Sequence, residues 1–184
     1  MFRRALARAD VPLRFSEGYN PHPRLNLPLP RPVGVSSSAE ALLIETDRDI
    51  DPADMSIRLA HHMPRGVELC GIKPWETGAP APEEVAYRIE FDGGAPADLD
   101  ERVTAFMDAT VVEVQRKSPK SVNPKTVNVR PFVIAMRTRD GAVEFTLRMN
   151  GGSSARPSEI AIALGLNPED HLHRIHRLEI RWRS

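Results

Sequence analysis

The chain lacks the features that mark secreted, membrane-spanning or cluster-binding proteins. Cys70 is the single cysteine among 184 residues, which excludes a disulfide within the chain and an iron–sulfur cluster held by several of its own thiolates. No apolar run approaches the ~20 residues that span a bilayer. The start, Met1-Phe2-Arg3-Arg4, lacks the apolar core of an export signal. We therefore expect a cytoplasmic protein.

Aromatic residues and net charge are also scarce. Aromatic side chains make up 5% of the chain, and 25 basic residues cancel 25 acidic ones. Net charge alone therefore indicates neither a nucleic acid nor a membrane as partner. The 41% hydrophobic content is ordinary for a globular protein, whereas the 17 prolines predict many loops and strand ends.

The neutral total hides a segregation of charge along the chain. Residues 1–31 carry six arginines against two acids, and residues 36–113 carry seventeen acids against six basic residues. Residues 116–139 then carry seven basic residues and no acid. Such blocks can build a basic face on a neutral protein, which is how a polyanion would be bound. Solvated loops with paired charges are the alternative.

The first 75 residues have the patterns of a small α+β unit. Helix-favouring composition precedes Pro12, and Asp51-Pro52 is a typical helix start. Alternating apolar residues indicate short strands. We expect helices over residues 2–9 and from Pro52 to near Pro64, with strands over 11–15, 25–29, 41–46 and 67–72.

Residues 76–82 have linker composition, and a second unit follows them. Asp98 and Glu101 have capping-box spacing, and Asp140-Gly141 is a typical hairpin turn. Residues 117–125 read as a polar, basic loop. We expect strands over 85–91, 111–115, 126–137, 143–149 and 178–182, with helices from Asp98 to Met107 and from Pro157 to Gly165.

The predicted fold class is α+β, with tandem ferredoxin-like (βαββαβ) units. The second unit, 83–184, has this order if the strand 111–115 and the hairpin are merged into two strands. The first unit, 1–75, lacks its opening strand, which lies inside the sheet of that fold. Its loss would leave two unpaired edges. We therefore expect a gene start upstream of Met1, another segment in the gap, or a different topology here.

One string of residues is specific. Residues 16–23 read Ser-Glu-Gly-Tyr-Asn-Pro-His-Pro, and the stretch 13–35 around them resembles the radical-SAM-linked domain of unknown function. This bacterial family occurs alone or attached to a radical SAM protein, and residues 39–45 and 128–132 continue the match. The resemblance implies an accessory to radical chemistry on RNA, with a radical SAM protein as partner. Members begin with a strand that this chain lacks, and the cluster-binding cysteine triplet is absent, as expected for the linked domain alone.

The loop from Ser16 to Arg24 is the strongest candidate site. Proline and glycine fix an irregular backbone there, which can present an acid, an imidazole, a cation and an aromatic ring together. The alternative is a rigid corner in which Asn20 and His22 bond the backbone while Tyr19 covers the core. Glu17 and His22 are the candidates for acid–base catalysis, and neither is assigned a specific catalytic step. The recognition loop comprises Ser16, Tyr19, Asn20 and His22.

Basic residues around 116–130 form the second candidate. Flexible cations among Ser, Asn and Pro suit phosphate contacts, whereas the alternative is a solvated hairpin loop. No aromatic residue is interleaved there for base stacking. The predicted phosphate-binding residues are Arg24, Arg116, Lys117, Lys120, Lys125 and Arg130.

Histidine and cysteine patterns predict neither a metal site nor a cofactor. His171, His173 and His176 are spaced so that no single regular structure gathers all three on one face. Cys70 falls in a strand pattern and is expected to be a buried small apolar residue.

We therefore predict an accessory RNA-binding module associated with a radical SAM enzyme, without catalysis of its own. The RNA would be tRNA or ribosomal RNA. One alternative is an enzyme with a Glu17/His22 acid–base site in a cleft between the two units. Another is a protein-docking module that binds the radical SAM partner through an exposed strand edge.

Overall fold

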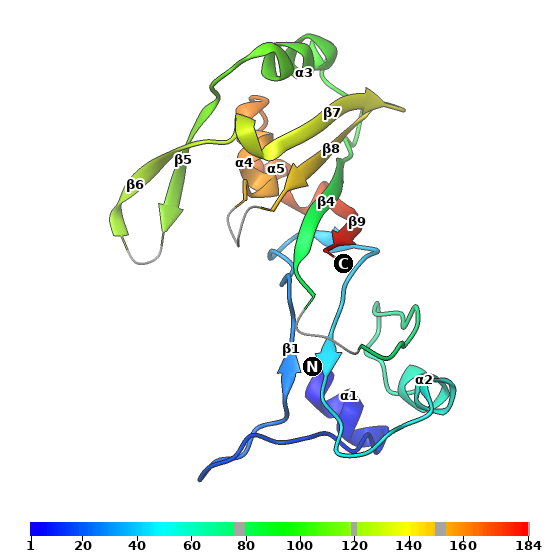
Figure 1. Ribbon diagram of the computed structural model, residues 1–184. Helices are drawn as coiled ribbons and strands as arrows, with labels where there is room; N and C mark the ends of the chain where they lie inside the picture. The colour runs from blue at the N-terminus through cyan, green and yellow to red at the C-terminus, as the bar shows by residue number, and fades with distance from the viewer. Residues whose placement is uncertain (76–79, 119–120, 150–153, 184) are drawn as a thin grey trace. The chain divides into compact units, whose positions relative to one another are not determined.

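The computed structural model describes residues 1–75, 80–118, 121–149 and 154–183 (Figure 1). These residues form two compact units. Unit 1 holds residues 1–28 and 41–75, and unit 2 holds residues 29–40 together with the described residues from 80 onward. Both units contain helices and sheets, so the fold is α+β. Within the described ranges, no helix is long and apolar enough to cross a membrane.

Unit 1 packs two helices beside a pair of short strands. Asp51 caps the second helix because its carboxylate accepts from the Ala53 amide at 3.0 Å, and Pro52 needs no hydrogen-bond partner. Leu6 from the first helix and Leu59 from the second lie in one apolar cluster. The elements are α1 (Phe2–Arg8), β1 (Leu25–Asn26), β3 (Leu43–Ile44), which pairs antiparallel with β1, and α2 (Pro52–Ala60).

Two of the strand predictions in unit 1 are wrong. Residues 67–72 form no strand, although Val67 and Leu69 are half-buried and alternate with exposed side chains. Residues 11–15 make only isolated bridges. Alternation predicts burial correctly, but a strand also needs a neighbouring segment to bond with, and no described residue bonds with 67–72 in a sheet. Cys70 is consequently exposed, not buried.

Unit 2 is built on a five-stranded sheet in the order β2-β9-β4-β8-β7. The edge strand β2 runs parallel to β9, whereas the other neighbouring pairs are antiparallel. The strands of this unit are β2 (Ser36–Ser37), β4 (Pro82–Ile89), β5 (Glu113–Ser118), β6 (Ser121–Asn128), β7 (Val133–Arg139), β8 (Ala142–Arg148) and β9 (Ile175–Trp182). The helices are α3 (Leu99–Asp108), α4 (Pro157–Ala163) and α5 (Pro168–His171), with 3-10 turns at Arg130–Phe132 and Leu172–Arg174.

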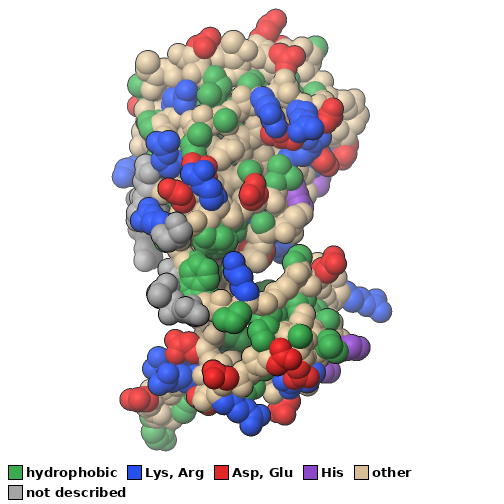
Figure 2. Space-filling view, turned by 45° about the vertical axis from the view of Figure 1, so that its right-hand side comes forward, with side chains coloured by type: hydrophobic (Ala, Val, Ile, Leu, Met, Phe, Trp, Pro, Cys, Tyr) green, Lys and Arg blue, Asp and Glu red, His purple; other side chains and the backbone are tan. Residues whose placement is uncertain are grey.

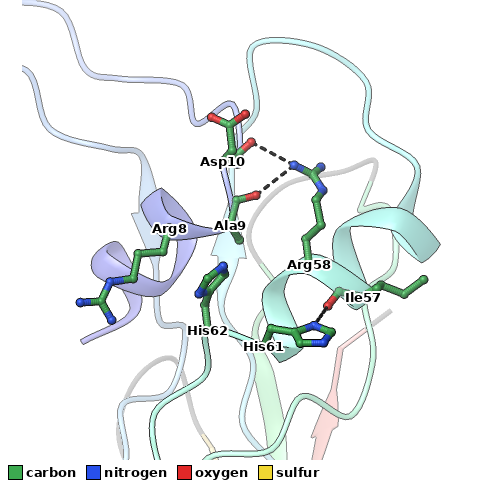
Figure 3. A pocket seen from close by; sticks show the side chains of 7 residues that line it. All are labelled: Arg8, Ala9, Asp10, Ile57, Arg58, His61 and His62. Atoms are coloured by element: carbon green, nitrogen blue, oxygen red, sulfur yellow. Dashed lines mark hydrogen bonds between the residues drawn. The ribbon is translucent and has the colours of Figure 1, made fainter.

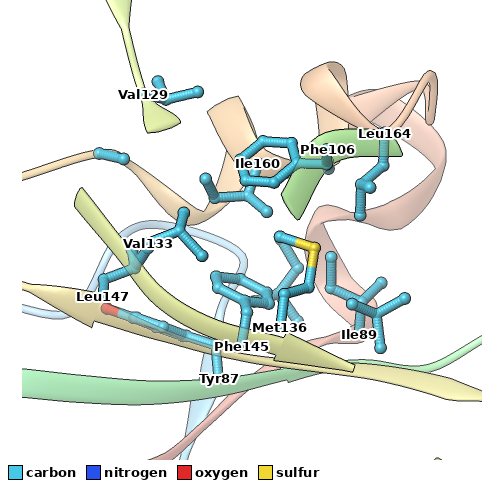
Figure 4. Packing of buried hydrophobic residues seen from close by; sticks show 14 of the residues in the cluster. Tyr87, Ile89, Phe106, Val129, Val133, Met136, Phe145, Leu147, Ile160 and Leu164 are labelled. Carbon is cyan, nitrogen blue, oxygen red and sulfur yellow. The ribbon is translucent and has the colours of Figure 1, made fainter. Parts of the chain in front are cut away.

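The core of unit 2 lies between one face of this sheet and two helices. Tyr87 and Phe145 are register partners whose rings stack with their centroids 5.5 Å apart. Phe106 of α3 and Ile160 of α4 pack over this face (Figure 4). Each such side chain contributes about 1.5–3 kcal/mol by leaving water. Alternate positions such as Arg88 of β4 and its register partner Glu144 of β8 lie on the opposite face of the sheet, where they form an ion pair.

The predicted hairpin about Asp140-Gly141 is confirmed, but its first strand is shorter than expected. Asp140 and Gly141 both adopt positive φ, 51° and 69°, as this tight turn requires. Residues 126–128 belong instead to β6, because that strand ends at Asn128 and a turn separates it from β7. The Asn128 side-chain oxygen accepts from the amides of Val112 and Arg130, and the 3-10 turn follows.

The predicted capping box at the start of α3 is wrong. The Asp98 side chain makes no cap hydrogen bond. Its carboxylate accepts from Arg102 Nε at 2.9 Å instead, and this hydrogen bond lowers the pKa of Asp98. The Asp98 carboxylate therefore bonds the arginine four residues later and not the backbone amides of the first helical turn.

Residues 29–40 are anchored to unit 2 by a buried arginine. Arg177 is 1% exposed on the core side of β9 and donates to the Leu29 carbonyl at 3.1 Å and the Glu40 carboxylate at 2.8 Å. Its guanidinium also lies 5.7 Å from the centre of the Tyr87 ring. Burial raises the pKa of Tyr87, and the charge of Arg177 opposes that rise. A buried cation is costly unless paired, so these contacts require the 29–40 segment to stay in place.

Candidate nucleic-acid interface

The basic residues around 116–130 lie on a hairpin made by β5 and β6. Figure 1 shows these two strands running away from the β7–β8 side of the sheet. Arg116 and Lys125 are direct register partners across the hairpin. The predicted basic loop is thus a strand pair, and Lys120 lies outside the described residues.

Arg116 is committed to the fold. Its guanidinium donates to both carboxylate oxygens of Glu159, at 2.6 and 2.7 Å, and to the Ser154 carbonyl at 3.0 Å. Glu159 is only 3% exposed. The hydrogen bond to Glu159 raises the pKa of the Arg116 guanidinium. Arg116 therefore fastens the hairpin to α4 and is not available to a phosphate.

Arg130 is committed in the same way, through backbone carbonyls. Its guanidinium donates to the Met107 carbonyl at 3.0 and 3.3 Å and to the Val133 carbonyl at 3.0 Å. These bonds tie the C-terminal end of α3 to the start of β7. Three donated hydrogen bonds leave this half-buried side chain little capacity for a ligand.

Lys117 and Lys125 are exposed and form no ion pair with any described residue. Arg156 lies beside Lys117, because its guanidinium is 3.4 Å from the Lys117 carbonyl. Its side chain is 54% exposed, and its acidic neighbour is Glu159 at 3.9 Å, which Arg116 already neutralises. Sequence reasoning missed Arg156, since it stands 39 residues after Lys117 in the chain. Figure 2 shows Lys and Arg side chains spread over this face of unit 2, with Asp and Glu side chains among them.

Arg24 lies in unit 1 and has an acidic partner. Its guanidinium is 3.2 Å from the Glu45 carboxylate, and both side chains are about half exposed. Its amide donates to the Arg14 carbonyl, and its carbonyl accepts from the Glu45 amide. An exposed ion pair of this kind contributes little, on the order of 0–1 kcal/mol, so a ligand phosphate can compete for Arg24.

The loop from Ser16 to Arg24 is closed by its backbone and presents its side chains to solvent. The Ser16 amide donates to the His22 carbonyl at 2.8 Å, and the His22 amide donates to the Ser16 hydroxyl at 3.0 Å. Gly18 adopts φ +121°, which L side chains rarely adopt. Tyr19 is fully exposed and does not cover the core, and Glu17, Asn20 and His22 are exposed too.

Two cavities lie elsewhere, and Glu17 and His22 line neither of them. The larger, about 400 Å³, lies between the C-terminal ends of α1 and α2 (Figure 3). Arg58 donates there to the carbonyls of Ala9 and Asp10 and pairs with Asp54, so its charge is already used. The smaller, about 220 Å³, lies at the start of α3.

The three C-terminal histidines lie in different surroundings. The His171 ring packs edge-on against Phe91, with the ring centres 5.6 Å apart, and His173 lies beside Arg174. His176 is held between two serine hydroxyls. Among the residues that the structure describes, no three His, Cys, Asp or Glu side chains are gathered in a way that could hold a metal ion.

Comparison with known protein families gives a match over most of the chain. The model of a family described as "Uncharacterized protein conserved in bacteria (DUF2344)" matches residues 1–157. The matched range includes the loop from Ser16 to Arg24 and the whole β5–β6 hairpin. No curated protein matches the chain.

Proposed function

The chain belongs to this uncharacterized bacterial family, and we propose that it is an accessory RNA-binding module that works with a radical SAM enzyme. The β5–β6 hairpin would contact phosphates through Lys117 and Lys125, with Arg156 beside Lys117. The recognition loop of unit 1 would add contacts of its own. The RNA is tRNA or ribosomal RNA.

The main support for this proposal is that some basic side chains of unit 2 are bonded to protein groups, whereas others are exposed. Arg116 and Arg130 are bonded to protein groups, whereas Lys117, Lys125 and Arg156 keep their charges at an exposed surface. Free flexible cations are what phosphate contacts require, and each contact releases counterions from the nucleic acid. Two exposed lysines on one hairpin that pair with no acid among the described residues therefore favour a polyanionic partner.

Exposed Tyr19 supports a single-stranded segment of RNA. Unpaired bases stack on aromatic rings, and each stacked base contributes about 1–3 kcal/mol. A fully exposed ring on a loop closed by two backbone-anchored hydrogen bonds is available for stacking without a large ordering cost. Arg24, whose exposed ion pair is weak, would contact a phosphate beside that base.

The ferredoxin-like expectation also becomes a proposal, and it has most support in unit 2. If β2, the β5–β6 hairpin, the short helix α5 and the 3-10 turns are set aside, the remaining elements follow the order β4-α3-β7-β8-α4-β9. The antiparallel order β9-β4-β8-β7 accompanies it. For unit 1, two helices and one pair of short strands are the described elements. Such a fold hosts many functions, so it adds little to the choice of ligand.

The radical SAM association rests on the resemblance of residues 13–35, which residues 39–45 and 128–132 continue. It is tested by co-purification with a co-expressed radical SAM protein, with and without nuclease. Recovery that survives nuclease supports direct docking. Recovery that nuclease abolishes supports an association through RNA, and absence of recovery under both conditions contradicts the partner.

RNA binding is tested by titrating a labelled RNA with the full chain at several salt concentrations. Two phosphate contacts contribute about 1.4 to the slope of log affinity against log salt on single strands. Lys117→Ala with Lys125→Ala should lower the slope by about this amount. Arg139→Ala with Arg181→Ala removes the same charge from side chains that already pair with acids, and it should leave the slope nearly unchanged. Equal losses in the two variants, or no binding at low salt, would exclude this interface.

A further inference from the structure

A histidine with both ring nitrogens engaged lies at the β2 edge of the sheet in unit 2. His176 on β9 is the register partner of Ser36 on β2, and Ser38 follows two residues further along the same segment. The Nδ1 atom of His176 is 2.7 Å from the Ser36 hydroxyl, and Nε2 is 2.6 Å from the Ser38 hydroxyl. The proposed RNA contacts use none of these three side chains.

The contacts around His176 accommodate the tautomer that a general base for Ser38 requires. The Ser36 hydroxyl oxygen lies 3.3 Å from the Ile175 carbonyl, to which it can donate, and it can then accept from the ring. In the tautomer that the inference below assigns, Nδ1 faces Ser36 and carries the proton. Nε2 is then left with a lone pair that accepts the hydrogen of the Ser38 hydroxyl. A general base for Ser38 needs this tautomer.

These three side chains have the relationships of an activated nucleophile. A hydroxyl lies within hydrogen-bond reach of a base, and a third group orients that base. We infer that Ser38 is a nucleophile and His176 its general base in a further activity towards carboxylic esters. Ser36 is the positioning residue, in the place that Asp occupies in a Ser–His–Asp arrangement. Because Ser36 is neutral, it orients the ring but stabilises its charged form less than a carboxylate does.

The acyl-transfer step balances with these groups alone. The Ser38 oxygen bonds to the carbonyl carbon of the ester, and its proton passes to Nε2 of His176. Collapse of the tetrahedral intermediate breaks the carbon–oxygen bond to the alcohol, which leaves with the proton from Nε2. Water then attacks the acyl-serine with the same base, which releases the carboxylic acid and restores the Ser38 hydroxyl.

The position of the cluster selects the kind of ester. Ser36 and Ser38 are exposed and His176 is half-buried, and neither cavity described above includes them. An open surface accepts a small ester, or an ester at the end of a larger molecule. Esters with a good leaving group should react fastest, since their tetrahedral intermediate collapses readily. The charged groups on this sheet face include Arg88, the register partner of His176, and Glu90 and Glu144, which pair with Arg88. The same face also carries Glu179, Glu84, Arg181, Arg148 and Arg137.

Acetylation by p-nitrophenyl acetate tests the assignment on the full chain. Mass spectrometry of the wild-type protein should place a single acetyl group on Ser38. His176→Gln keeps a side chain that can bond both serines but cannot act as a general base, and it should lower the rate of the p-nitrophenolate burst about 100-fold or more.

Two further variants separate catalysis from structure. Ser37→Ala is the matched control, because the Ser37 hydroxyl bonds Ala39 and not His176, and it should leave the rate unchanged. Ser36→Ala should slow acetylation while Ser38 remains the modified residue, since it loosens the ring but leaves the nucleophile. No adduct on Ser38 of the wild-type protein, or an equal rate in His176→Gln, overturns the inference. Neither result bears on RNA binding, which is measured separately.

Discussion

Substitution of Arg116 tests most directly whether this arginine stabilises the fold while the exposed lysines contact RNA. Arg116→Ala removes the cation that bonds both oxygens of the Glu159 carboxylate, which is 3% exposed, and leaves only Arg156 at 3.9 Å. Breaking a buried ion pair from one side costs about 3–5 kcal/mol. The Arg116 side chain is 25% exposed, so water partly solvates the remaining charge, and we expect the lower end, about 3 kcal/mol. For a unit of this size, that lowers Tm by about 12 °C.

The assay is urea unfolding followed by circular dichroism, with two comparison variants. Lys117→Ala removes a neighbouring exposed cation, and it should change the free energy of unfolding by less than about 0.5 kcal/mol. Arg116→Ala combined with Glu159→Gln removes the uncompensated charge. The side-chain oxygen of the introduced glutamine can still accept from the Arg156 amide, as Glu159 does at 2.8 Å. The double variant should therefore recover about 1–2 kcal/mol of the loss.

The contrary result is equally clear. Suppose that Arg116→Ala unfolds with a free energy close to that of the wild type and lowers the salt dependence of RNA affinity as Lys117→Ala does. Arg116 would then be a phosphate contact, and the ion pair with Glu159 would contribute nothing to folding. The distinction between committed and free cations would fail, and the proposed interface with it.

Three further outcomes follow from the same contacts. Hydrogen bonds from Arg137, and to a lesser extent Arg88, hold the pKa of Glu144 below its ordinary 4.5. The ionised carboxylate therefore stabilises the folded protein at pH values above 4.5, and Glu144→Gln should remove that stabilisation. Urea unfolding should show this difference shrink as the pH falls through the lowered pKa. Arg177→Met removes the buried cation, and limited proteolysis should then cleave within residues 29–40 faster than in the wild type. Tyr19→Ala should weaken binding of single-stranded RNA by about 1–3 kcal/mol without changing its salt slope, and binding assays at two salt concentrations would show whether the slope moves instead.

Local sequence patterns determined the elements whose causes are local. Pro52 after a capping Asp51 begins α2, and the Asp140-Gly141 pair turns β7 into β8. Apolar alternation in β4 placed Val85, Tyr87 and Ile89 in the core. These signals depend on backbone conformation and on which face is apolar, and both can be read within a few residues.

Partners far apart in the sequence were decided by the tertiary structure. Apolar alternation over residues 67–72 gave the correct burial but no strand, because a strand also needs a neighbour. The sequence alone predicts the same phosphate-binding role for Arg116 and for its neighbour Lys117. Only the approach of Glu159, forty-three residues later, commits one of them to the fold and leaves the other at the surface.

The sequence by itself determined that this is an α+β protein with a proline-stiffened loop and a basic stretch near residues 116–130. Tertiary structure alone decided which cations are free, that Arg156 joins the hairpin, and that Ser36 and Ser38 hold His176 between them. The physical reason is that charge and hydroxyl chemistry belong to residue types. Whether a charge is neutralised, or a hydroxyl polarised, depends on groups that the chain brings close from distant positions.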